Sequence, residues 1–169
     1  PQQQEFQSSQ QRGAPQGIHF PVEAHCRLIN KVDIDSDNQA LTRKLLAKTA
    51  QQAQGRCLGS EGIRLLAYRL QNELIVQGYI TSLIDVPSQS LEQGILRLTL
   101  KYGKVGAIDY AGGSDITRLW NSLPLSPGAI LRLSDLEQGM ANLQRLPGST
   151  AHMKLLPGQR EGESDLQIA

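Results

Sequence analysis

The residues that most often carry out acid–base catalysis are few and isolated in this sequence. The three histidines are His19, His25 and His152, and none has a carboxylate and a nucleophile beside it in a recognisable catalytic order. The sequence also contains no Gly-x-Ser-x-Gly motif, no phosphate-binding glycine loop and no helical His/Glu metal pair. We therefore expect no active site and no enzymatic activity.

One stretch resembles the start of a calcium loop but does not complete it. Asp33, Asp35 and Asp37 alternate as calcium ligands do, but the sixth position is Asn38 rather than Gly and the twelfth is Lys44 rather than Glu. A helix cap at Asp37 or Asn38 explains the run better. With no zinc spacing elsewhere, the sequence predicts neither a metal site nor a cofactor.

The two cysteines, Cys26 and Cys57, leave two interpretations open. A disulfide between them would close a loop of about 30 residues and stabilise the fold by roughly 3–4 kcal/mol in a loop-entropy estimate. It would also imply an oxidising compartment. The alternative is a pair of unrelated buried thiols, since two cysteines alone do not specify a compartment.

Charge and composition exclude several classes of partner. The 169 residues carry a net charge of +1, with basic residues interspersed among acidic ones, and aromatic residues make up 4% of the chain. Nucleic-acid binding needs a basic face or a base-stacking surface, so we expect no nucleic-acid partner. No apolar run approaches the roughly 20 residues that span a bilayer, and the glutamine-rich N-terminus does not resemble a signal peptide.

Periodicity predicts a helix followed by a hairpin in the N-terminal half of the chain. Apolar residues at three- and four-residue spacing predict a helix over 63–75, with Ser60 as its N-cap and Gly78 at its end. β-Branched and aromatic residues predict a strand over 79–86, and strict alternation predicts another over 96–102. The sheet would bury one face against the helix and expose the other.

This order of elements recurs, which predicts an α+β protein with two similar units. The first unit adds a strand over 22–34 and a helix over 41–50, giving the order strand, helix, helix, strand, strand. The expected elements of the second unit follow a strand from Lys104: a helix over 116–123, a helix opened by a capping box over 134–137, and strands over 150–156 and 165–168. Each unit is expected to be a three-stranded mixed sheet covered by two helices.

Three segments are predicted along the chain. Residues 1–19 are rich in glutamine and form a flexible linker, residues 20–103 form the first domain, and residues 104–169 form the second. The chain begins at Pro1 and stops at Ala169 within a predicted strand, so we expect it to be a piece of a longer protein, with the second domain truncated at or near its last strand.

Three motifs in the first domain resemble a known family. They are Gly78-Tyr79-Ile80-Thr81, Val86-Pro87-Ser88-Gln89-Ser90-Leu91-Glu92-Gln93-Gly94-Ile95-Leu96-Arg97-Leu98 and Tyr102-Gly103-Lys104-Val105. Their order and spacing resemble the first POTRA (polypeptide-transport-associated) domain of the outer-membrane transporters of two-partner secretion, which export haemolysins, adhesins and contact-dependent inhibition toxins. Cys26 and Cys57 also resemble a cysteine pair seen in many members. Residues 104–169 are similar to the second POTRA domain, with looser motifs.

The resemblance implies a periplasmic region of a bacterial outer-membrane protein. Its partners would be a secreted exoprotein, captured through its unfolded N-terminal secretion domain, and the transporter's own C-terminal outer-membrane barrel, which this chain lacks. The glutamine-rich segment would lead to an N-terminal helix that plugs the barrel. Two alternatives stay open, namely the POTRA region of a general barrel-assembly factor and a cell-division scaffold domain, which would need an upstream membrane helix.

A sheet covered on one face has edges to which an extended peptide can add. The predicted strand over 79–86 contains only Asp85 as a charge and no internal proline, so it is a candidate open edge, unless a neighbouring domain packs against it. Apolar side chains in the groove between this strand and the preceding helix would provide selectivity. The residues predicted to bind the client are Tyr79, Ile80, Thr81, Leu83, Ile84, Leu74, Met153 and Leu155.

Overall fold

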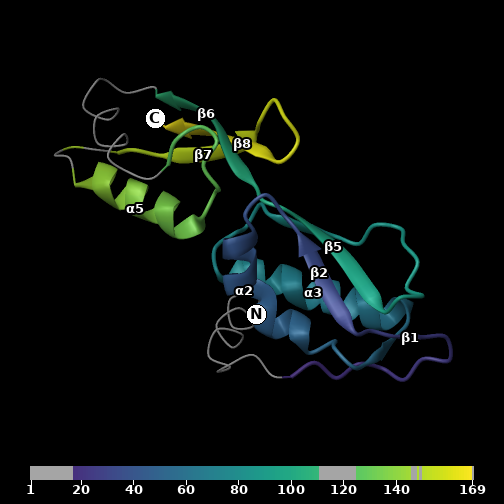
Figure 1. Ribbon diagram of the computed structural model, residues 1–169. Helices are drawn as coiled ribbons and strands as arrows, with labels where there is room; N and C mark the ends of the chain where they lie inside the picture. The colour runs from purple at the N-terminus through teal and green to yellow at the C-terminus, as the bar shows by residue number, and fades with distance from the viewer. Residues whose placement is uncertain (1–16, 111–124, 146–147, 149, 169) are drawn as a thin grey trace.

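The computed structural model describes residues 17–110, 125–145, 148 and 150–168, which form two α+β units joined where one strand leads into the next (Figure 1). The elements of the first unit are β1 (Arg27–Leu28), β2 (Lys31–Asp35), α2 (Gln39–Gln51), β3 (Cys57–Leu58), α3 (Ser60–Val76), β4 (Leu83–Asp85) and β5 (Ile95–Lys101). The described elements of the second are β6 (Lys104–Tyr110), α5 (Leu133–Gln144), β7 (Met153–Pro157) and β8 (Glu163–Ile168).

Both units contain a three-stranded mixed sheet with the same topology. In the first sheet the order is β2-β5-β4, with β5 parallel to β2 and antiparallel to β4. In the second the order is β6-β8-β7, with β8 parallel to β6 and antiparallel to β7. The predicted α+β class and its architectural repeat are therefore confirmed. The helix predicted over 116–123 lies outside the described residues.

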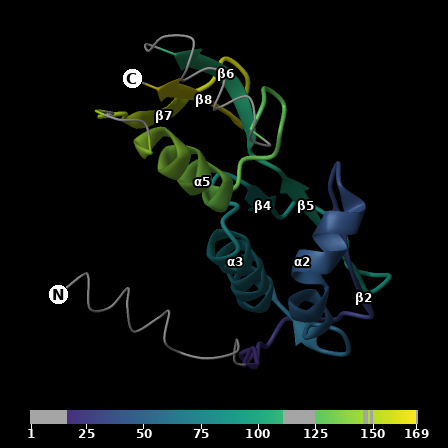
Figure 2. The same ribbon diagram turned by 90° about the vertical axis from the view of Figure 1, so that its left-hand side faces the viewer.

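Alternation along β5 determines which face of the first sheet is covered. Leu96, Leu98 and Leu100 are buried, while the intervening positions are exposed or partly exposed. These leucines pack with Leu66, Leu70 and Leu74 of α3 in one core, and α2 and α3 lie together on this face (Figure 2). Each fully buried leucine contributes about 2 kcal/mol to folding, so this layer supplies much of the unit's hydrophobic stability.

Helix starts agree only partly with the predictions. Asn38 caps α2, because its Oδ1 accepts from the Leu41 N–H at 3.1 Å, as predicted. Ser60 was predicted to cap α3 and is instead its first residue, following Gly59. The capping box predicted over 134–137 is also wrong, because α5 begins one residue earlier and no side chain caps it.

Three predicted strands are too long, and the one predicted over 150–156 begins only at Met153 as β7. The segment over 79–86 pairs only at Leu83–Asp85, because the chain turns first: the Tyr79 N–H bonds to the Leu74 carbonyl and the Ser82 N–H to the Tyr79 carbonyl. The segment over 22–34 divides into β1 and β2, because Ile29 pairs in both directions with the loop at 55–56.

Candidate functional site

The β4 edge of the first sheet is occupied by a side chain from α3. Gln71 Nε2 donates to the Ser82 carbonyl at 2.8 Å, and the Ile84 N–H donates to Gln71 Oε1 at 2.9 Å. These backbone groups point away from β5 and are the type of group that an added strand would use. At this point the Gln71 amide already takes the place of a neighbouring strand.

A second amide covers the same side of the sheet beyond the end of β4. The last pair of the β4 ladder joins Asp85 to Thr99. Two residues further along β5, the Arg97 N–H donates to Gln89 Oε1 and Gln89 Nε2 donates to the Arg97 carbonyl, both at 2.7 Å. Gln89 belongs to the Pro-x-Gln motif, so the structure gives this motif an edge-covering role.

The predicted client-binding residues lie in several different environments. Leu74 and Tyr79 are core residues with 0% and 6% of their surface exposed, and Ile84 packs against the same core. Ile80 and Met153 pack against the second core. Only the Leu83 and Leu155 side chains are well exposed, by 57% and 40%. The structure therefore does not bring the eight residues together into one surface.

The segment that follows α3 forms a joint between the two units. The Leu133 N–H donates to the Gly78 carbonyl at 2.8 Å, and Arg132 Nε donates to the Gln77 carbonyl at 3.1 Å. The Arg132 guanidinium also lies over the Tyr79 ring, 5.3 Å from its centroid. Gly78 has a φ of +94°, which favours glycine and lets the chain leave the helix towards Leu133.

Thr81 and Ser82 of the predicted strand pack against Gly103, the residue that links the two sheets. The Gly103 N–H donates to Ser82 Oγ at 2.9 Å, and the Gly103 carbonyl accepts from the Leu131 N–H at 2.8 Å. A side chain at Gly103 would clash with Thr81, whose buried Oγ1 has no partner among the described residues. Both the Gly-Tyr-Ile-Thr motif and the Tyr-Gly motif therefore build the joint.

The other edge of the sheet, along β2, has no such cover within the described chain. The Lys31 N–H bonds to the Gly94 carbonyl on the β5 side, so alternation directs the backbone groups of Val32 and Ile34 outward. Outside the pairing with β5, no described residue hydrogen-bonds to the backbone over 32–35. This edge offers a peptide a row of unused donors and acceptors.

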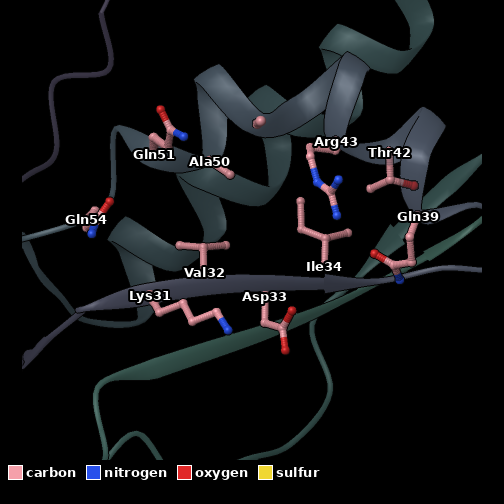
Figure 3. Close-up of a pocket in the computed structure, with 11 residues that line it drawn as sticks. Lys31, Val32, Asp33, Ile34, Gln39, Thr42, Arg43, Ala50, Gln51 and Gln54 are labelled. Atoms are coloured by element: carbon pink, nitrogen blue, oxygen red, sulfur yellow. The ribbon is translucent and has the colours of Figure 1, made fainter.

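A groove of about 400 Å³ runs beside this edge, between β2 and α2 (Figure 3). Its lining residues are Lys31, Val32, Asp33, Ile34, Gln39, Thr42, Arg43, Ala47, Ala50, Gln51 and Gln54. Val32 and Ile34 point towards α2, whereas Lys31 and Asp33 point to the opposite face. An extended peptide added to β2 would therefore place every second side chain in the groove.

The sequence contained a signal for this edge that was missed. The letters of β2 alternate charged and apolar residues, which is typical of a half-exposed edge strand. The prediction merged β2 with the preceding residues into one long strand, and strand order could not be read from the sequence. Composition alone therefore favours the less charged β4 as the open edge.

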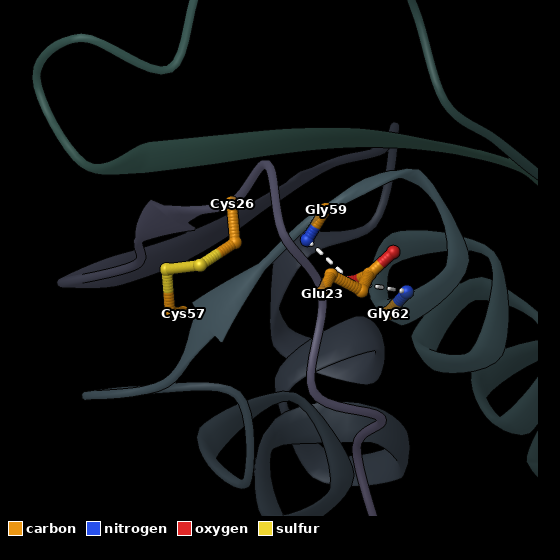
Figure 4. The surroundings of a disulfide bond; sticks show 5 residues. All are labelled: Glu23, Cys26, Cys57, Gly59 and Gly62. Atoms are coloured by element: carbon orange, nitrogen blue, oxygen red, sulfur yellow. Dashed lines mark hydrogen bonds between the residues drawn. A yellow bond between two sulfur atoms is a disulfide. The ribbon is translucent and has the colours of Figure 1, made fainter.

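At the N-terminal end of α3, two contacts hold the N-terminal segment in place (Figure 4). A disulfide links the segment to β3, and a carboxylate binds the first turn of the helix. Cys26 and Cys57 form a disulfide, with their Cα atoms 5.3 Å apart, which is the first of the two interpretations that the sequence left open. The Glu23 carboxylate accepts from the N–H groups of Gly59, Glu61 and Gly62 at 2.6, 2.8 and 3.1 Å. Glu23 thereby serves as the helix cap expected of Ser60.

The electrostatics of this cap follow from the three donors. Desolvation raises the pKa of Glu23, but the hydrogen bonds from Glu61, Gly59 and Gly62 outweigh it, so the pKa lies below its ordinary value. The fit needs glycine at position 59, because a Cβ there would lie 2.7 Å from the Glu23 carboxylate. No group of three or more metal-ligating side chains occurs in the described ranges.

No helix in the part of the chain that the structure describes is long and apolar enough to cross a membrane.

Known protein families match both units. Residues 28–103 match the family described as a POTRA domain of the ShlB type, and residues 104–157 match a POTRA domain family. The outer membrane transporter CdiB-2 of Burkholderia pseudomallei is 32% identical over 132 residues, which cover 78% of this chain and 22% of that protein. The outer membrane transporter CdiB of Dickeya dadantii is 31% identical over 173 residues, covering 96% of this chain and 30% of that protein.

A solved structure shares the fold. CdiB from Acinetobacter baumannii superposes with a TM-score of 0.76 at 24% identity, covering 99% of this chain and 36% of that one. The chain thus spans 22–30% of the length of the two relatives above. It belongs to the family of two-partner secretion outer-membrane transporters and consists of tandem POTRA domains.

Proposed function

We propose that this chain is the periplasmic recognition region of a two-partner secretion transporter. It captures the unfolded N-terminal secretion domain of a partner exoprotein and passes it to the transporter's outer-membrane barrel. The observation that carries the proposal is the uncovered β2 edge beside a groove of about 400 Å³. The family assignment supports the secretory role. The task is recognition without catalysis, cofactor or nucleic acid.

Binding would proceed by strand addition. The client's backbone would pair with the outward groups of Val32 and Ile34, extending the sheet to four strands. Main-chain pairing accepts many sequences, so selectivity would come from client side chains that enter the groove under α2. An unfolded secretion domain suits this mode, because a folded one has already paired its strands.

An NMR titration tests the proposal. The fragment is titrated with the N-terminal segment of the exported protein encoded beside it, and with the corresponding segment of a non-cognate exoprotein as control. We expect saturable shifts on β2 and α2 with the cognate segment only. The predicted residues Leu83, Ile84 and Leu155 report on the β4 and β7 edges in the same spectra. Shifts confined to those edges would refute binding at β2.

A variant makes the titration quantitative. Val32→Pro removes an outward donor from β2 while leaving the Lys31 and Asp33 contacts with β5. Ile84→Pro removes the outward donor of the opposite edge, from a residue that packs against the same core as Val32, and serves as the matched control. We expect Kd to rise at least tenfold for Val32→Pro only. An equal response to any unfolded β-rich segment would favour the general barrel-assembly factor instead.

A further inference from the structure

We infer that Arg43 makes the groove selective for an acidic client strand. The favoured client presents a carboxylate opposite Ile34 and an apolar side chain opposite Val32, two residues apart on the strand. The inference rests on the proposed function, because it assumes that a strand adds to β2. It goes further by naming the chemistry that the strand must contain.

The positions follow from strand geometry. Side chains of a β-strand alternate between faces, and an added strand lies beside β2 in register. Because Val32 and Ile34 point towards α2, the client residues opposite them enter the groove (Figure 3). The residue between them faces away with Asp33. Two consecutive inward positions of the client therefore determine what α2 contacts.

The helix α2 presents one charged side chain to the groove, Arg43. The helix contains Arg43, Lys44 and Lys48 and no acidic residue. Arg43 extends from α2 towards β2 beside Ile34, and it forms no ion pair with any described residue (Figure 3). The other charged residues at the groove are Lys31 and Asp33, whose side chains point to the opposite face of β2. A guanidinium binds a carboxylate through two parallel hydrogen bonds, so an Asp or Glu completes this site.

The neighbouring position is apolar. Ala50 lies above Val32 and both line the groove, as do Gln51 and Gln54 at the same end (Figure 3). At the other end of the groove, beside Arg43, the Thr42 hydroxyl is within hydrogen-bonding distance of the Tyr102 hydroxyl at 2.8 Å. A branched aliphatic client residue opposite Val32 would bury the apolar surface that half-buried Val32 leaves exposed.

Synthetic peptides test the inference. The peptides have nine residues, blocked ends and threonine at every second position. At two consecutive inward positions they contain valine and then Glu, Gln or Lys. Both orders are made, because the direction of the added strand decides which residue comes first. Calorimetry should show that Glu binds about threefold more tightly than Gln, as expected for one solvent-exposed ion pair, and that Lys binds more weakly than Gln. Equal affinities for all three would overturn the inference.

Charge reversal assigns the effect to one residue. Arg43→Glu should reverse the order so that the Lys peptide binds best, and Arg43→Gln should remove the preference. Lys44→Glu changes the net charge equally from a position that does not line the groove, and it should keep the preference for Glu. An equal loss of preference in Lys44→Glu would mean that only the overall charge matters, which would also overturn the inference.

The outcomes separate this inference from the proposed function. If peptides and the secretion segment shift β2 resonances whatever the residue opposite Arg43, strand addition stands and the acidic preference is wrong. If neither shifts β2 in the wild-type protein, the proposed site itself fails. Arg43 is an exposed residue, so circular dichroism should show that each of its variants retains the fold.

Discussion

The two edges of the first sheet flank the same central strand but offer an incoming peptide opposite surfaces. β4 is three residues long, and the Gln71 and Gln89 amides occupy backbone groups along its side of the sheet. β2 is five residues long, and its outward groups face a groove. A strand's composition therefore does not decide whether its edge is open. Side chains from distant elements decide it.

The largest expected effect comes from blocking the open edge. Val32→Pro should raise the Kd for the secretion segment at least tenfold, because an added strand loses a backbone donor and meets the proline ring. Ile84→Pro, which removes the outward donor of the β4 edge, should change that Kd less than threefold. Titration calorimetry measures both variants, with near-ultraviolet circular dichroism as the control for folding. The reverse order of effects would place the client on β4 and contradict the assignment of β2 as the open edge.

A second change should open the closed edge. Gln71→Ala frees the Ser82 carbonyl and the Ile84 N–H, so NMR titration should show new client shifts at β4 in addition to those at β2. The variant should also lose about 1–2 kcal/mol of unfolding free energy in urea melts, because two hydrogen bonds disappear. Asn72→Ala, which removes the neighbouring amide on the same helix, is the control. An absence of client-induced shifts at β4 in a folded Gln71→Ala variant would show that the Gln71 amide does not close this edge.

A smaller effect of the same kind is expected at Gln89. Gln89→Ala leaves the Arg97 backbone without its side-chain partner, at a position open to water. Water can replace the lost partner there, so unfolding free energy should fall by only about 0.5–1 kcal/mol. Amide exchange at Arg97 should accelerate. Unchanged amide exchange at Arg97 would show that Gln89 does not cover this edge of the sheet.

The smallest effect on binding is expected at the Glu23 cap, which lies on neither edge. Glu23→Gln should leave the client Kd unchanged while lowering stability at neutral pH. The pKa of Glu23 is lowered in the folded state, so its contribution is present above the ordinary value of 4.5 and is lost as pH falls through the folded pKa. The stability gap between wild type and variant in thermal melts should therefore close in acid. A gap that stays constant into acid would contradict this role.

Some features of the fold could be predicted because they depend on local patterns. The alternation of Leu96, Leu98 and Leu100 predicted β5, and Asn38 was among the expected caps of α2. Other features depend on contacts between distant residues. Glu23 replaces Ser60 as a cap from 36 residues before Gly59, and no local motif signals it. The length of β4 depends on turns after α3 and on packing against the second unit.

The candidate site was less predictable than the fold for the same reason. Tyr79 and Thr81 belong to a motif with high strand propensity, yet one is core and the other packs against Gly103. Strand order, which makes β2 an edge, is a property of the assembled sheet. Arg43 looks like any exposed helical arginine until β2 and the groove are placed beside it.

Residue-resolved amide hydrogen exchange, measured with and without the secretion segment, shows directly which edge of the first sheet receives the client. In the free protein the Val32 and Ile34 N–H groups should exchange rapidly, whereas the Ile84 N–H, bonded to Gln71, should already be protected. Binding should slow exchange at Val32 and Ile34 and leave Ile84 unchanged. Protection gained around Ile84, with Val32 and Ile34 unaffected, would contradict the assignment of β2 as the edge that receives the client.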